Sequence, residues 1–146
     1  EEIKYVSITT DIVVGFPGES EEEFKNTYKF LEEIKLSKMH VFKYSPRSGT
    51  KAAEMKEQID GNIKEERSNI LIELNKKLEK DFMKKFLEKE FQVLYEEKSD
   101  CDENSYEGYA QNYIKVVTKS DMNLQGKIVN TIIKSVKEDY VLGKLK

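Results

Sequence analysis

Residues 11–20, DIVVGFPGES, join a short apolar run to a glycine-rich turn and then to a helix-capping serine. The β-branched residues 12–14 are typical of a strand that is buried on both faces, in a parallel sheet covered by helices. Gly15 and Gly18 allow positive φ and a close approach of the backbone to a ligand, while Pro17 fixes its own φ. The pattern therefore predicts a strand that ends in a ligand-facing turn.

A helix is predicted to follow this turn. Ser20 and Glu23 have the spacing of a capping box, which satisfies two main-chain donors at a helix start. Apolar side chains then recur at helical spacing, at Phe24, Tyr28, Leu31 and Ile34. Strand, turn and helix together predict one unit of an α/β fold.

Alternation along the strand places Asp11, Val13 and Gly15 on one face and turns their neighbours toward the helices. With Glu19, these residues resemble, with one extra residue in the turn, the GxIxGxxE strand of radical S-adenosylmethionine (SAM) enzymes. Residues 37–55, SKMHVFKYSPRSGTKAAEM, resemble the next strand and loop in the methylthiotransferase branch of these enzymes. The segment SKMHVFKYSPR is most similar to the corresponding segment of the enzymes that act on threonylcarbamoyladenosine in tRNA.

The rest of the chain resembles the third part of these enzymes, a small β-barrel called the TRAM domain. The similar segments are GYAQNYIKVV, LQGKIVNTIIKSV and YVLGKL. A long helix over about residues 63–87 is predicted before it, with Asn62 and Glu65 as a second capping signature. The predicted strands cover residues 91–97, 109–118, 127–136 and 140–145.

The expected fold is therefore α/β plus all-β. Residues 1–59 would be the last strands and helix of a truncated radical-SAM partial barrel, 60–87 a connecting helix, and 88–146 an OB-like RNA-binding barrel. The sequence begins without methionine just ahead of a strand. We expect a C-terminal portion of a longer enzyme.

The resemblance implies the residues that contact SAM and substrate. The SAM-binding candidates are Asp11, Val13, Gly15, Phe16, Pro17, Gly18, Glu19 and Arg47. The substrate-pocket candidates are His40, Phe42 and Tyr44.

Each polar candidate also has a purely structural explanation. Arg47 could hold a carboxylate bidentately or form an ordinary loop salt bridge. His40 could contact a ligand or be a hydrogen-bonded packing residue, and the packing role is commoner for a single strand histidine. Glu19 is explained by helix N-terminus electrostatics alone, which we favour over ligand contact.

Candidate RNA contacts lie in the barrel region, where aromatic platforms and cations occur together. They are Tyr109, Asn112, Tyr113, Lys115 and Lys127. From residue 110 onward there are seven lysines against three acids, although the net charge of the whole chain is −3. Simple alternation between core and surface is the other explanation for this segment.

The implied cofactors are SAM and two 4Fe-4S clusters. Such clusters are held by several thiolates, and the sequence has one cysteine, Cys101, whose acidic neighbours disfavour the thiolate. Cys101 is therefore predicted to be a bystander, and the chain alone is predicted to be inactive. The cluster ligands would lie elsewhere in the full-length enzyme.

The implied reaction adds a methylthio group to carbon 2 of N6-threonylcarbamoyladenosine beside the tRNA anticodon. Isopentenyladenosine tRNA and a ribosomal protein remain alternative substrates, and a non-catalytic RNA-binding module is a second class. With 36 % charged residues and no long apolar run, no membrane span is expected, and the predicted location is cytoplasmic. The open edge of the truncated barrel predicts self-association or domain swapping.

Overall fold

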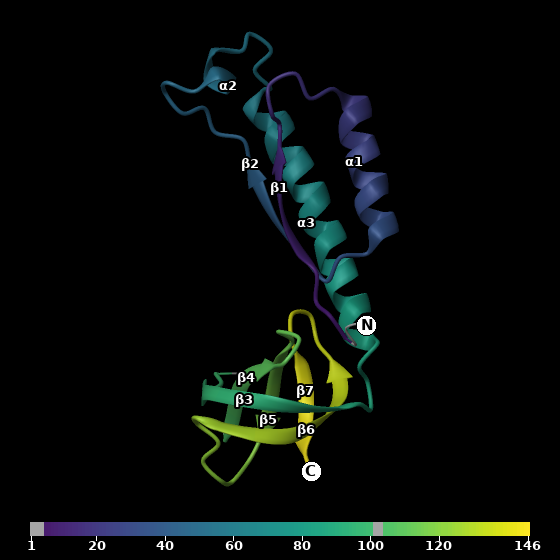
Figure 1. Cartoon of the computed structure of the whole chain (residues 1–146), viewed down its shortest axis with the longest axis vertical. Coiled ribbons are helices and arrows are strands. Elements are labelled where there is room, and N and C mark those ends of the chain that lie inside the picture. Colours follow the sequence, from purple (N-terminus) through teal and green to yellow (C-terminus); the bar gives the residue numbers. More distant parts are fainter. Residues whose placement is uncertain (1–4, 101–103) are drawn as a thin grey trace. The chain divides into compact units, whose positions relative to one another are not determined.

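The computed structural model describes residues 5–100 and 104–146, which form two compact units. Residues 8–78 make the first, named here the α/β unit. Residues 5–7 with 79–146 make the second, named the barrel unit (Figure 1). Cys101 lies outside the described residues.

The α/β unit contains two parallel strands and three helices. β1 (Thr9–Val14) leads to α1 (Glu21–Ile34), which returns the chain to β2 (Lys38–Lys43). A short helix, α2 (Lys51–Glu54), precedes α3 (Gly61–Lys84), which runs on into the barrel unit. β1 and β2 pair in parallel, as expected for strands joined by a crossover helix.

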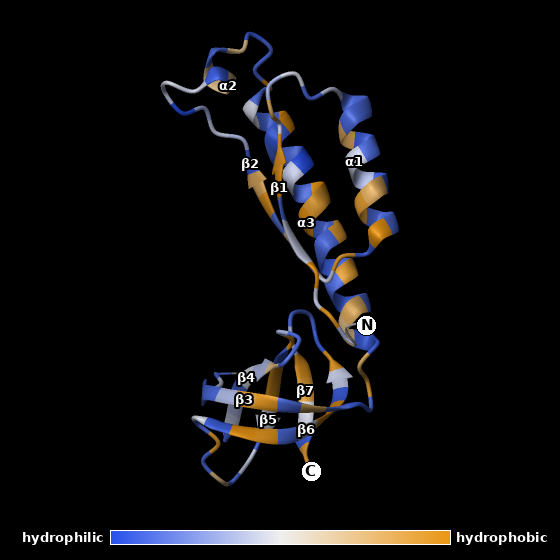
Figure 2. Cartoon of the chain, viewed as in Figure 1, coloured by the Kyte–Doolittle hydropathy of each residue, from blue (hydrophilic) through white to orange (hydrophobic). Residues whose placement is uncertain are grey.

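One face of this strand pair is packed against the helices. Val14 and Met39 are buried in one cluster with the apolar faces of both long helices, whose members are Phe24, Leu31, Leu71, Leu74 and Leu78. Apolar stretches are visible on β1, β2, α1 and α3 in Figure 2. On the opposite face, Val13 and Phe42 are about half exposed. The strands were predicted to be buried on both faces, and in this structure they are covered on one.

The two edges of the pair differ. At β2, the main-chain N–H of Met39 donates to Oδ1 of Asn75 on α3, 2.7 Å away. At β1, no described strand pairs with the edge opposite β2. The helix therefore caps part of one edge, and β1 retains main-chain groups that could pair with another strand.

The barrel unit is a closed, five-stranded barrel. Its strands in chain order are β3 (Glu90–Lys98), β4 (Ser105–Ala110), β5 (Lys115–Lys119), β6 (Lys127–Val136) and β7 (Val141–Leu145). Around the barrel the order is β3-β4-β5-β7-β6, and β6 closes onto β3. All neighbours are antiparallel except β5 and β7. The prediction of a small OB-like barrel is confirmed at this level.

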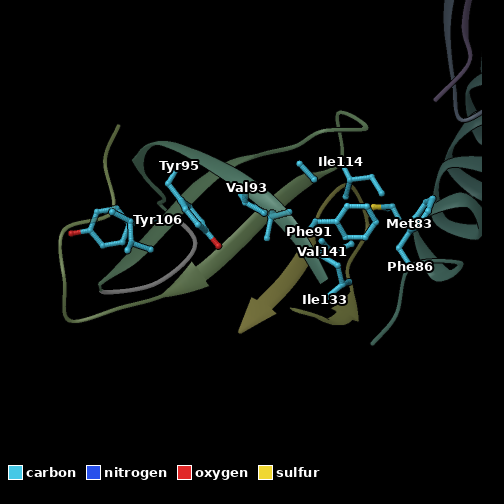
Figure 3. Close-up of a cluster of buried hydrophobic side chains, with 12 residues drawn as sticks. Met83, Phe86, Phe91, Val93, Tyr95, Tyr106, Ile114, Ile133 and Val141 are labelled. Carbon is cyan, nitrogen blue, oxygen red and sulfur yellow. The ribbon is translucent and has the colours of Figure 1, made fainter. Parts of the chain in front are cut away.

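The barrel interior is largely apolar and contains a buried cluster of three hydroxyl groups. Figure 3 shows the side chains of Phe91, Val93 and Ile133 directed into the interior. Tyr95 is fully buried, and its hydroxyl donates to Oγ1 of Thr118 at 2.8 Å and lies 2.9 Å from Oγ1 of Thr131. Burial raises the pKa of Tyr95, and the two threonine hydroxyls only partly offset this. The phenol is therefore held neutral as an internal cross-link between strands.

Two sequence predictions need correction. The single strand predicted over 109–118 is split, because a tight turn at residues 110–113 separates β4 from β5. The turn is closed by the N–H of Tyr113 donating to the carbonyl of Ala110. At α3, the cap is Asp60 rather than Asn62, since Oδ1 of Asp60 accepts from the Asn62 N–H at 2.8 Å.

The predicted connecting helix contributes side chains to the hydrophobic cores of both units. Leu71 and Leu74 of α3 belong to the core of the α/β unit, whereas Met83 and Phe86 belong to the core of the barrel unit.

Among the helices of the described residues, none is both long and apolar enough to cross a membrane.

Candidate functional site

The turn after β1 has the predicted backbone geometry. Gly15 and Gly18 have φ angles of 71° and 88°, which residues with a Cβ atom rarely adopt. Ser20 caps α1, and the Ser20–Glu23 capping box is complete in both directions. Hydrogen bonds from the main chain and hydroxyl of Ser20 lower the pKa of Glu23. The turn is thus held firmly at the start of α1.

Glu19 has a partner that the sequence analysis missed. Its Oε2 accepts the Gly15 N–H at 2.7 Å and also Nη1 of Arg67 on α3 at 2.5 Å. The side chains of Arg67 and Glu19 are only 7 % and 15 % exposed. A signal was present in the sequence, because Arg67 falls on the same helical stripe as Leu71, Leu74 and Leu78. A charged residue on an apolar stripe indicates a buried ion pair.

The exposed face of β1 and β2 brings several predicted residues together. Val13, Phe42, Tyr44 and Arg47 line a hollow of about 450 Å³. The ring of Phe16 packs edge-on against Tyr44, with centroids 5.3 Å apart. The hydroxyl oxygen of Tyr44 is buried and has no hydrogen-bond partner. The hollow therefore combines the apolar side chains of Val13 and Phe42 with the guanidinium of Arg47, while the Tyr44 hydroxyl is covered by protein.

The remaining candidates of this unit are not among the residues that line the hollow. Asp11 and His40 are exposed neighbours in the strand register. Pro17 is buried in the turn, and the N–H of Gly18 donates to the carbonyl of Glu57 at 2.9 Å.

The chain cannot by itself supply the ligands of an iron–sulfur cluster. Cys101 is its one cysteine. Within residues 5–100 and 104–146, no group of three His, Cys, Asp or Glu side chains could hold a metal ion.

In the barrel unit, the predicted RNA contacts have different surroundings. Tyr109 and Tyr113 are exposed and line one hollow, whereas Asn112 is buried. Lys127 is exposed at the start of β6. Lys115 instead pairs with Glu107 at 2.8 Å, and this hydrogen bond raises the pKa of Lys115 and lowers that of Glu107.

A group of lysines that had not been singled out surrounds another hollow of the barrel. Lys119, Lys137 and Lys144 line a space of about 670 Å³ over β5, β7 and the β6–β7 loop, together with Tyr140. In OB-type barrels, the second and third strands and the loop between the fourth and fifth bind oligonucleotides. Those elements correspond here to β4, β5 and the β6–β7 loop.

Comparison with known proteins supports the resemblance to methylthiotransferases. The chain is a relative of the methylthiotransferases, and the similarity covers nearly all of it. It is 44 % identical over 137 residues to the threonylcarbamoyladenosine tRNA methylthiotransferase MtaB of Bacillus subtilis, which is 92 % of this chain and 30 % of that protein. No protein-family model matches the chain.

Two other kinds of methylthiotransferase are also similar. A tRNA-2-methylthio-N(6)-dimethylallyladenosine synthase of Acetivibrio thermocellus is 38 % identical, over 99 % of this chain and 30 % of that protein. The ribosomal protein uS12 methylthiotransferase RimO of Clostridium botulinum is 41 % identical, over 77 % of this chain and 24 % of that protein. The chain thus spans about a third or less of the length of these curated relatives.

Proposed function

We propose that this chain is part of a radical-SAM methylthiotransferase that modifies tRNA. The proposed reaction adds a methylthio group to carbon 2 of N6-threonylcarbamoyladenosine next to the anticodon. The observation that carries the proposal is the 44 % identity to MtaB over 92 % of the chain. The site of such a reaction on tRNA would place the enzyme in the cytoplasm.

The exposed face of β1 and β2 would form one wall of the SAM pocket. Val13 and Phe42 would provide an apolar surface for an adenine ring. Arg47 could bind a carboxylate, either of SAM or of the threonylcarbamoyl group. The Gly15–Gly18 turn would lie at the adenine end of SAM, and Glu19 with Arg67 would hold the turn in shape.

Bound SAM and its cluster would supply a radical that removes hydrogen from the substrate base. The ligands of both clusters would come from parts of the enzyme outside this chain, which supplies a single cysteine. We therefore keep the prediction that the chain alone is inactive.

The barrel unit would be the RNA-binding TRAM domain. Its closed barrel is of the OB type, and Lys119 on β5 and Lys137 in the β6–β7 loop lie on elements with which such barrels bind oligonucleotides. Lys144 on the adjoining β7 lines the same hollow. Lysine contacts to phosphates release counterions, which makes binding dependent on salt.

Other substrates are the main alternatives. The 38 % identity to a dimethylallyladenosine tRNA synthase favours a second tRNA substrate, and the 41 % identity to RimO favours a ribosomal protein. A non-catalytic RNA-binding module is a further candidate, supported by the barrel alone.

Titration of a tRNA anticodon stem-loop with this chain tests the RNA-binding proposal. The double substitution Lys137→Ala and Lys144→Ala should weaken binding and reduce the slope of log affinity against log salt by about two. Lys134→Ala is the matched control, because Lys134 is paired with Glu88 at 2.6 Å and lines none of the described hollows. Unchanged affinity in the double variant would remove these lysines from the proposed surface.

A further inference from the structure

Two hollows flank the β4–β5 loop of the barrel, and neither is lined by Lys119, Lys137 or Lys144. The larger, of about 720 Å³, is walled by Leu94, Tyr109 and Ile128. The smaller, of about 390 Å³, contains Asn112. Tyr113 and Gln111 line both hollows. The loop therefore separates two recesses that share an aromatic ring and an amide.

Asn112 is the unusual residue of this loop. The residue is only 7 % exposed, yet neither its Nδ2 nor its Oδ1 has a hydrogen-bond partner. Buried amides in folded proteins are almost always paired, because an unpaired one is costly. Asn112 lines the smaller hollow, but both amide atoms are covered by protein, so a ligand that offers one acceptor and one donor side by side would pair with them by shifting the loop.

Tyr113 is presented in a way that folding alone does not explain. Its φ is 60°, in the left-handed region that a bulky residue seldom adopts, and the residue is 83 % exposed. Glycine is usual at this position of a short hairpin loop. The backbone conformation of Tyr113 is therefore unfavourable, and little burial of the ring offsets its cost. The ring is left open to solvent.

The charge around the loop argues for a base rather than a phosphate. Among the described residues that line the two hollows, the one charged side chain is Glu96. An acid repels phosphate, while amides and tyrosine rings suit a nucleobase. Gln111 and Gln92 add two further amides, which are bonded to each other at 3.3 Å.

We propose that the β4–β5 loop binds one unpaired adenine of an RNA strand. The base would stack on the ring of Tyr113, and its N6 amino group and N7 would pair with the carboxamide of Asn112. This inference rests on the proposed RNA binding. It adds a base-specific contact to the proposed phosphate contacts of Lys119, Lys137 and Lys144.

The test compares fluorescently labelled oligoadenylate and oligouridylate, each titrated with the whole chain at several salt concentrations. The wild type should bind oligoadenylate at least about fivefold more tightly. Asn112→Ala should abolish this preference and leave the salt slope unchanged. Tyr113→Ala should weaken binding of both strands at least about fivefold, and Tyr113→Phe should restore it, because only the ring is needed.

Controls separate the base contact from folding and charge. Asn112→Asp keeps the shape but removes the donor, and Asn130→Asp adds the same charge at an exposed position of β6 outside the described hollows. Loss of preference in Asn112→Asp but not in Asn130→Asp supports the adenine site. Salt-dependent binding without any preference in the wild type, or a preference that survives Asn112→Ala, overturns it while leaving the proposed RNA binding standing. Failure to bind either strand at low salt contradicts the proposed RNA binding itself.

Discussion

Glu19 accepts the main-chain N–H of Gly15 across the turn that follows β1, at 2.7 Å. The same oxygen is paired with Arg67, whose side chain is 7 % exposed. One carboxylate thereby ties the glycine turn to helix α3. Because this pair is largely buried, removing one partner leaves the other charge without compensation.

We predict that Glu19→Gln lowers the free energy of unfolding of the α/β unit by about 3 kcal/mol. The amide oxygen can still accept from Gly15, so the loss would report the unpaired Arg67. Urea unfolding followed by circular dichroism at helical wavelengths measures it, with exposed Glu22→Gln as the control. If both variants unfold at the same urea concentration, the ion pair contributes nothing to stability.

The Glu107–Lys115 pair gives a prediction on pH. The pKa of Glu107 is lowered, so its contribution is present above the ordinary glutamate pKa and is lost as pH falls through the lowered value. The pKa of Lys115 is raised, so its contribution is present below the ordinary lysine pKa and is lost as pH rises through the raised value. The pair should therefore stabilise the barrel fully between about pH 5 and pH 10.

Glu107→Gln tests this pair. At neutral pH the variant should be less stable by about 0.5–1 kcal/mol, and the difference from wild type should shrink below about pH 4. Denaturant unfolding followed by tyrosine fluorescence across this pH range checks both points, with Glu138→Gln as the exposed control. A difference that persists unchanged in acid would show that the charge pair is not its cause.

Tyr113→Gly should separate stability from binding. Glycine adopts positive φ without strain, so the variant should be as stable as the wild type or more stable by up to about 1 kcal/mol. Its affinity for oligoadenylate should nevertheless fall, because the stacking ring is gone. Thermal unfolding and RNA titration of the same sample provide the comparison. Destabilisation by more than about 1 kcal/mol would mean that the ring serves the fold.

The uncovered edge and face of the strand pair predict association. Val13 and Phe42 are about half exposed, and the edge of β1 opposite β2 is unpaired among the described strands. Light scattering across a dilution series should show concentration-dependent dimers or larger species. Val13→Lys should reduce the amount of these species. A wild-type chain that stays monomeric at high concentration would show that this surface does not cause self-association.

The sequence predicted the parts of the fold in which local signals and burial agree. The Ser20–Glu23 capping box and the positive φ of Gly15 and Gly18 were predicted and are confirmed, and β6 has its predicted bounds. The turn at residues 110–113 was missed because it has no glycine or proline, and Tyr113 adopts the conformation that glycine would normally provide.

The site was harder to predict because its pairings join distant segments. Arg67 reaches Glu19 across 48 positions, and the Glu107 partner of Lys115 comes from a neighbouring strand. Periodicity identifies which face of an element is apolar, but it does not say which charged residues will meet. The roles of the SAM-facing residues remain predictions from the resemblance.

A chimeric enzyme tests the central claim most directly. In it, this chain replaces the aligned segment of the Bacillus subtilis MtaB, in a strain that lacks its own copy. Mass spectrometry of tRNA nucleosides should then detect the 2-methylthio form of N6-threonylcarbamoyladenosine, and Arg47→Ala in the chimera should reduce it. A chimera that is present at normal levels in the cell but leaves this nucleoside unmodified would contradict the account.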